Sequence, residues 1–187
     1  KNKKEIVAIN HYGRHIIVIL PKKEKDSNQH AENCRLIGET LTGKLKDEKS
    51  AIIVDVKGNQ TEAMQIAEGI ALSNYTFTKH KTEGKANKLE TIYLCKNSNK
   101  KDIEELQNIV VSVYLTRDLV NEPFSHLTAK DLAESAKKAG KKSGFKTTVF
   151  HKKKIESLKM GGLLAVNKGS IDEPTFTIME WKPKTAK

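Results

Sequence analysis

The sequence predicts an α/β fold with a mixed, largely parallel sheet flanked by helices. Short runs rich in β-branched residues alternate with segments whose apolar residues recur every three or four positions. One early pair of such runs is separated by a turn-like HYGR, which predicts an antiparallel hairpin in an otherwise parallel arrangement. A chain of 187 residues, 37% hydrophobic and 30% charged, is long enough to bury a core in one domain or in two small ones.

Residues 1–122 form the first predicted domain, an α/β domain that ends in a long helix. An amphipathic helix is predicted from Asp26 to about Asp47, because apolar residues recur there every three or four positions: Ala31, Cys34, Ile37, Leu41 and Leu45. The run SAIIVDV predicts a strand that is buried on both faces if it lies in a parallel sheet. In chain order we expect strands at 5–10 and 15–21, the helix 26–47, a strand at 50–56, a helix opened by Asn59 with Glu62, a strand at 89–95 and a helix ending near Asn121, before Pro123.

Residues 123–187 form the second predicted block. Thr128 followed by Asp131 has the capping-box spacing and predicts a helix over 129–142. The runs KTTVF and TFTIMEW predict strands, with a short helix, KKKIESLKM, and the glycine-bearing stretch MGGLLAVNKGS between them. About 65 residues with two or three strands would give a marginal core on their own.

The charge balance leaves one binding function open. The net charge is +11, and the eight lysines between Lys137 and Lys154 have no acidic residue among them. Such a segment attracts nucleic acid, and Phe145 and Phe150 could stack on bases. However, the chain has three arginines, the usual base-reading cations, and lysines near a helix C-terminus also complement its dipole. A lysine-rich nucleic-acid-binding module therefore stays as a weak alternative.

Motifs for most catalytic chemistries are absent. MGGLLAVNKGS has lysine and glycine in the wrong order for a phosphate-binding loop, and no GxGxxG, HExxH or GxSxG occurs. The cysteines, Cys34 and Cys95, are expected to be buried, reduced thiols in a cytoplasmic protein. The longest apolar run, residues 16–20, is too short to span a membrane, and no signal peptide is visible. The histidines show no metal-ligand spacing: His11, His15, His30, His80, His126 and His151.

Ordered motifs across residues 115–181 resemble the start of the catalytic domain of the leucyl aminopeptidases (cytosol aminopeptidases), which are dinuclear-metal exopeptidases. The family pattern has Arg-x-Leu-x-Asn-x-Pro, then Leu-Thr, a helix, a strand, Met-Gly-x-Leu-Leu-Ala-Val, Gly-Ser and a proline before an apolar strand. The residues in register are Arg117, Leu119, Asn121, Pro123, Leu127, Thr128, Met160, Gly161, Leu163, Leu164, Ala165, Val166, Gly169, Ser170 and Pro174. Residues 1–114 fit less distinctively, as part of that family's macro-like N-terminal domain.

The resemblance implies a cytoplasmic hydrolase that removes N-terminal residues, leucine among the favoured ones, from peptides. It further implies two divalent ions, zinc, manganese or magnesium, and a homohexamer. The family's metal and catalytic motifs do not occur between Lys1 and Lys187. We therefore assign no catalytic and no metal residue, and expect this chain alone to be inactive, to bind no metal and to serve structure and oligomer packing. The chain does not begin with Met, and we expect the first strands and helix of the N-terminal domain to precede Lys1.

The resemblance also makes MGGLLAVNKGS a structural signature, with glycines that permit tight turns and close approach. A nucleotide-binding domain of the macro type is a further alternative for the first block. Residues 1–122 show no glycine-rich ligand loop, which weighs against it.

Overall fold

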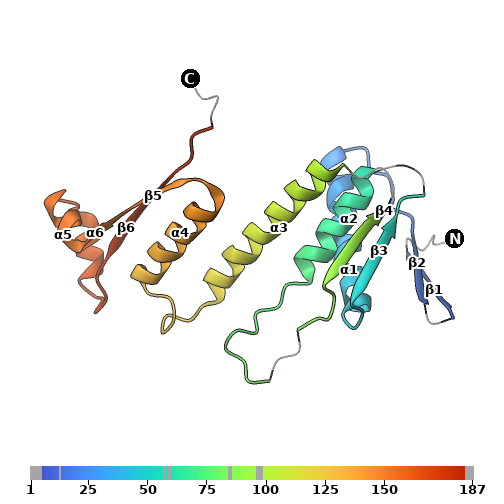
Figure 1. Cartoon of the computed structure of the whole chain (residues 1–187), viewed down its shortest axis with the longest axis horizontal. Helices are drawn as coiled ribbons and strands as arrows, with labels where there is room; N and C mark the ends of the chain where they lie inside the picture. The colour runs from blue at the N-terminus through green and yellow to red at the C-terminus, as the bar shows by residue number, and fades with distance from the viewer. Residues whose placement is uncertain are drawn as a thin grey trace. The chain divides into compact units, whose positions relative to one another are not determined.

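The computed structural model describes residues 6–12, 14–56, 58, 60–83, 86–95 and 99–183. The chain divides into two compact units, Lys1–Arg117 and Asp118–Lys187 (Figure 1). The domain limits expected from the sequence, after residue 122, remain a prediction.

Unit 1 consists of two small sheets covered by helices. The expected antiparallel hairpin is present as β1–β2, with Ile6 opposite Ile19. Strands β3 and β4 pair in parallel, with Ala51 beside Ile92, through the crossover that contains α2. The elements are β1 Ile6–His11, β2 Arg14–Ile19, α1 Ser27–Leu45, β3 Ser50–Val54, α2 Gln60–Ser73, β4 Thr91–Cys95 and α3 Lys100–Asn121, which runs into unit 2.

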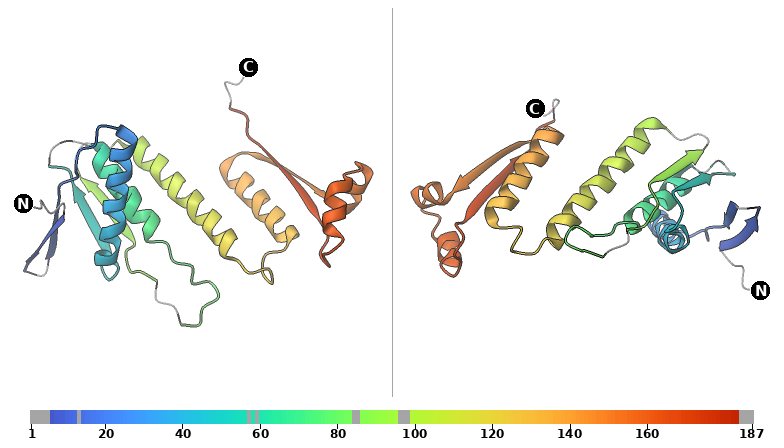
Figure 2. Two further views of the ribbon diagram at one scale, coloured as in Figure 1. Left: turned by 180° about the vertical axis from the view of Figure 1, so that it is seen from behind. Right: turned by 60° about the horizontal axis from the view of Figure 1, so that its bottom comes forward.

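Helices α1 and α2 lie side by side and form the core of unit 1 with the inner faces of the strands (Figure 2). The two backbones approach closely at two glycines. A Cβ added to Gly38 would lie 2.3 Å from the carbonyl oxygen of Ile66, and one added to Gly69 would lie 2.1 Å from that of Arg35. Glycine is therefore required at this crossing, where no side chain fits between the helices.

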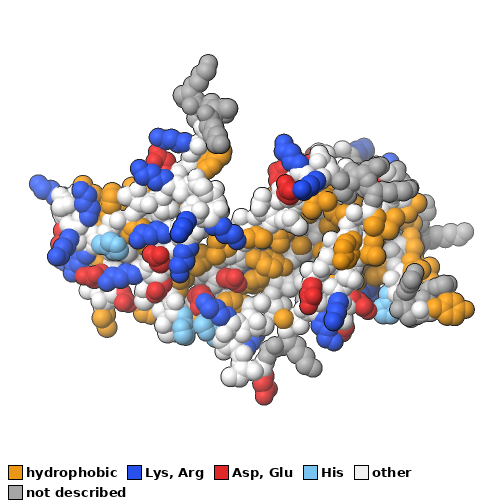
Figure 3. Space-filling view, viewed as in Figure 1, with side chains coloured by type: hydrophobic (Ala, Val, Ile, Leu, Met, Phe, Trp, Pro, Cys, Tyr) orange, Lys and Arg blue, Asp and Glu red, His pale blue; other side chains and the backbone are white. Residues whose placement is uncertain are grey.

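The outer face of β3 and β4 is exposed, although the sequence predicted that the β3 strand would be buried on both faces. Ile52 is 65% exposed, Val54 55% and Tyr93 54%, so the strand expected to be buried on both faces is covered on one. The reason is that α1 and α2 both pack on the inner face, where Ala51 and Ile53 contact the core. Figure 3 shows apolar side chains gathered over these strands.

Unit 2 consists of an antiparallel strand pair with one long and two short helices. Strand β5 Lys146–His151 pairs with β6 Thr175–Glu180, and Phe150 lies opposite Phe176. Helix α4 Ala129–Ser143 packs against both strands, and α5 Lys152–Ser157 places Ile155 fully inside. Helix α6 Gly161–Asn167 follows.

Local sequence signals position α4. Its N-terminus carries the predicted capping box: Thr128 Oγ1 accepts from the Asp131 backbone N–H, and Asp131 accepts from that of Thr128. Gly144 ends the helix with φ 81°, the left-handed conformation that glycine adopts without a steric cost.

The mixed α/β class is confirmed. Among the described residues the strands form three separate pairs rather than one sheet, and β3–β4 is the parallel pair. No helix in the described part of the chain is both long and apolar enough to cross a membrane.

Candidate functional site

Two of the described histidines, His15 and His30, each lie beside a single carboxylate. His30 Nε2 lies 2.9 Å from Glu62 Oε1, while Nδ1 lies 3.1 Å from the carbonyl oxygen of Lys22. His15 Nδ1, on an exposed side chain, lies 3.4 Å from Glu48 Oε1. The His30–Glu62 contact joins two residues 32 positions apart, and no spacing in the sequence indicated it. It joins α1 to α2, while the contact with Lys22 holds the segment before α1, and both are structural roles.

No group of three or more His, Cys, Asp and Glu side chains in the described ranges is arranged to hold a metal ion. The described residues therefore do not fit the two divalent ions that the family resemblance implies, and no step of metal chemistry can be derived from them. The side chain of His11 is not among those that the structure describes.

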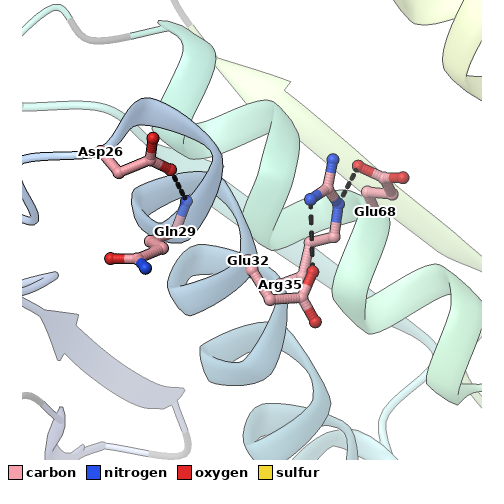
Figure 4. A network of polar contacts seen from close by, with 5 residues as sticks. All are labelled: Asp26, Gln29, Glu32, Arg35 and Glu68. Atoms are coloured by element: carbon pink, nitrogen blue, oxygen red, sulfur yellow. Dashed lines mark hydrogen bonds and ion pairs between the residues drawn. The ribbon is translucent and has the colours of Figure 1, made fainter.

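A polar network ties α1 to α2 beside the glycine crossing (Figure 4). Arg35 Nε donates to Glu68 at 2.7 Å across the two helices, and Arg35 Nη1 donates to Glu32 at 3.4 Å. The hydrogen bond to Glu68 raises the pKa of Arg35 above its ordinary value, and the negative charge of Glu68 raises it further. Burial of the guanidinium has the opposite, smaller effect on this pKa. Asp26 caps α1 by accepting from the backbone N–H of Gln29 at 2.8 Å. These charged side chains are engaged with one another or with backbone inside the fold, so they join the two helices and cap α1 and do not indicate catalysis.

The two cysteines lie in different environments. Cys34 is fully buried, and burial, with a smaller contribution from Glu62, raises the pKa of its thiol against the opposing charge of Arg35. A buried thiol that stays protonated is a poor nucleophile. Cys95, at the end of β4, is exposed, so the expectation that both thiols are buried was wrong for this residue. Its neighbours explain this: Leu94 turns inward, and the next side chain of a strand points to the opposite face.

The lysine-rich segment is exposed but does not form one continuous run in space. All eight lysines from Lys137 to Lys154 are exposed, and Lys137 pairs with Glu134 at 3.5 Å. Strand β5 separates the lysines of α4 from those of α5 by six extended residues, or about 20 Å. Phe150 stacks on Phe176 with ring centroids 6.2 Å apart, so its ring is engaged within the fold. Both findings weaken the nucleic-acid alternative.

The stretch MGGLLAVNKGS forms a short exposed helix, α6, rather than a ligand loop. Cβ atoms added to Gly161, Gly162 or Gly169 would meet nothing within 4 Å, so the expected close approach is absent at these glycines. The tight turn is at Lys159, which precedes α6 with φ 53°. Helix α6 has no buried residue, and Val166 is 86% exposed. The close approach expected at these glycines is therefore wrong for the described residues, whereas Gly169 lies in a turn closed by a hydrogen bond from the Ser170 N–H to the Asn167 carbonyl oxygen.

Pro174 and Ser170, two residues of the family motif, serve local structure. Pro174 is buried and precedes β6, while Asn167 Nδ2 donates to the carbonyl oxygen of Asp172 at 2.9 Å. Ser170 Oγ accepts from the backbone N–H of Asp172 at 3.2 Å. These contacts shape the connection from α6 to β6.

Arg117 lies in a cluster that sequence reasoning missed. It donates through Nη1 to the carbonyl oxygen of Leu72, and its guanidinium lies 5.4 Å from the ring centroid of Tyr75. Tyr114 donates through its hydroxyl to the carbonyl oxygen of Ala71. Tyr75 and Tyr114 make a T-shaped contact with centroids 5.0 Å apart. No local signal could have revealed hydrogen bonds that span 43 and 45 positions.

Comparison with known proteins relates this arrangement to one family. The sequence model of the cytosol aminopeptidase family, catalytic domain, matches residues 114–187. A probable cytosol aminopeptidase from Chlorobaculum tepidum is 44% identical over 138 residues, covering 64% of this chain and 26% of the relative. One from Sulfurihydrogenibium sp. is 32% identical over 182 residues, covering 91% of this chain and 36% of the relative. The chain belongs to the cytosol aminopeptidase family.

Two solved structures share the fold of this chain. A mutant of tomato leucine aminopeptidase superposes with a TM-score of 0.79 at 21% identity, over 97% of this chain and 39% of that one. The bottromycin maturation enzyme BotP, in complex with Mn, gives a TM-score of 0.79 at 19% identity, over 96% of this chain and 39% of that one. At such identities the likeness shows the fold. The chain spans 26% and 36% of the length of the two cytosol aminopeptidase relatives above.

Proposed function

We propose that this chain is part of a metal-dependent leucyl aminopeptidase, a hydrolase that removes N-terminal residues, leucine among the favoured ones, from peptides. The observation that carries the proposal is the agreement between the ordered motifs and the family match over residues 114–187. Support also comes from cytosol aminopeptidase relatives that align along 91% of the chain.

We place the two divalent ions of the complete enzyme, zinc, manganese or magnesium, on residues outside this chain. The basis for this placement is that the family's metal-ligand motifs do not occur between Lys1 and Lys187. The complex of BotP with Mn supports a divalent metal in proteins of this fold. On this proposal the 187 residues alone neither bind the metal pair nor hydrolyse peptides, and they contribute structure.

The proposal extends to assembly and location. We propose a homohexamer in which these residues contribute to subunit packing, and a cytoplasmic location.

The test is hydrolysis of leucyl-p-nitroanilide with added manganese. It compares the product of the complete reading frame with the 187-residue chain. The proposal predicts metal-dependent release of p-nitroaniline by the longer protein and none by the chain. Absence of activity in both would overturn it.

A further inference from the structure

Helix α3 is the least buried of the three helices of unit 1. None of its 22 residues is buried, whereas α1 and α2 each bury five. An open hollow of about 230 Å³ lies between α2 and the first half of α3, lined by Met64, Leu106 and Ile109 among others. At this end a long polar contact runs from Gln60 Nε2 to Asp102, at 3.4 Å. Side-chain packing along α2 therefore does little to fix α3.

The stronger contacts come at the other end, where α2 finishes. The last carbonyl groups of a helix have no donor within the helix. Tyr114 and Arg117, one turn apart on α3, donate to two carbonyls of this last turn, those of Ala71 and Leu72. The Ala71 carbonyl also accepts from the Asn74 backbone N–H at 3.2 Å, just past the helix. The last turn of α2 has no basic residue of its own, so Arg117 supplies the positive charge that its dipole favours.

Aromatic contacts complete this cluster. The Arg117 guanidinium lies over the Tyr75 ring, and that ring meets Tyr114 edge to face. Burial raises the pKa of Tyr114, against the effect of the Arg117 charge, so its hydroxyl stays protonated as a donor at neutral pH. Each of the three side chains therefore contacts at least one of the other two. Tyr114 and Arg117 also donate hydrogen bonds to the end of α2.

We propose that Tyr75, Tyr114 and Arg117 form a clasp that positions α3 on the C-terminus of α2. Arg117, which opens the family's motif, is on this proposal a residue that positions α3 within unit 1. Lysine cannot replace it, because a lysine ammonium lacks the planar fork that donates to a carbonyl while stacking on a ring.

Hydrogen exchange of the 187-residue chain, read by mass spectrometry, tests the clasp. The variants are Arg117→Met, Arg117→Lys and Tyr114→Phe, with Lys101→Met as the matched control, since Lys101 is an exposed cation on the same helix. We expect both Arg117 variants to lose about tenfold protection in α3 and in the last turn of α2. Protection in α1 and β3 stays unchanged, and the control matches the wild type.

The lysine variant separates positioning from a general need for charge. Full protection in Arg117→Lys, or in Arg117→Met, would overturn the proposal. If the Arg117 variants fail to fold, Tyr114→Phe decides, because it removes one hydroxyl and keeps the ring. The proposal predicts a loss of protection of several-fold around Ala71 in that variant, and wild-type protection there would overturn it.

Discussion

Replacing Gly69 by alanine tests how closely α1 and α2 cross. The new Cβ would lie 2.1 Å from the Arg35 carbonyl oxygen, where ordinary contact begins at 3.4 Å. The obstacle is backbone on a packed helix and cannot rotate aside, so the helices would have to separate by about 1 Å. Gly38→Ala meets the same obstacle from the other helix, at Ile66.

The magnitude follows from two opposing effects. Overpacking of this kind costs about 3 kcal/mol, and alanine returns about 1 kcal/mol of helix propensity. The net loss is about 2 kcal/mol, or a fall in Tm of about 8 °C for a domain of this size. Gly43→Ala is the matched control on α1, because a Cβ there meets nothing within 4 Å. It should stabilise unit 1 by about 0.5–1 kcal/mol.

The assay is thermal unfolding of the 187-residue chain, followed by circular dichroism. Trp181, the single tryptophan, lies in unit 2, whereas both substitutions lie in unit 1. Its fluorescence should therefore differ little between the wild type and the variants. Unfolding of Gly69→Ala at or above the wild-type temperature, with Gly43→Ala behaving as described, would refute the close crossing.

Three further predictions concern the cap of α4, the thiols and α6. Thr128→Ala should destabilise unit 2 by about 1 kcal/mol in urea unfolding at pH 7; an unchanged midpoint would contradict the capping role. Hydrogen bonds from Thr128 lower the pKa of Asp131 below its ordinary 3.8, so this cap stabilises at neutral pH and is lost as the pH falls through the lowered value. Unfolding across acid pH should show that loss in the wild type and a smaller loss in the variant, which keeps the backbone N–H of residue 128 as a donor to Asp131. A maleimide should label one thiol of the native chain, Cys95, and a second, Cys34, only after unfolding; labelling that persists in Cys95→Ser would contradict this. Gly162→Ala should be tolerated or stabilising by up to about 1 kcal/mol in thermal unfolding, and a lower Tm would restore a packing role for this glycine.

Local signals account for what the sequence predicted well. Thr128 and Asp131 are three positions apart, and the hydrogen bonds they form are made within the same helical turn. The alternation of strands with amphipathic helices likewise predicted the α/β class. The exposure of Cys95 was also available, since Ile92 and Leu94 set the inward face of the strand and the next residue falls on the other.

Contacts between distant segments account for what it missed. Arg117 contacts Leu72 and Tyr75, and His30 contacts Glu62, over separations that carry no periodic signal. The sequence did not indicate that α1 and α2 cross at Gly38 and Gly69, because a glycine within a helix can occur with or without a close contact to another helix. For Gly161 the opposite error arose: a glycine typical of close approach lies in open space, since no described segment packs against it.

The most direct test of the central claim is the product of peptide cleavage. A leucine-initiated peptide and its N-acetylated counterpart are incubated, with manganese, with the protein from the complete reading frame. Mass spectrometry then follows the products, and the 187-residue chain serves as the control. The account predicts that the longer protein removes the N-terminal leucine from the free peptide and leaves the acetylated one intact. Internal cleavage, equal cleavage of both peptides, or no cleavage of either would contradict it.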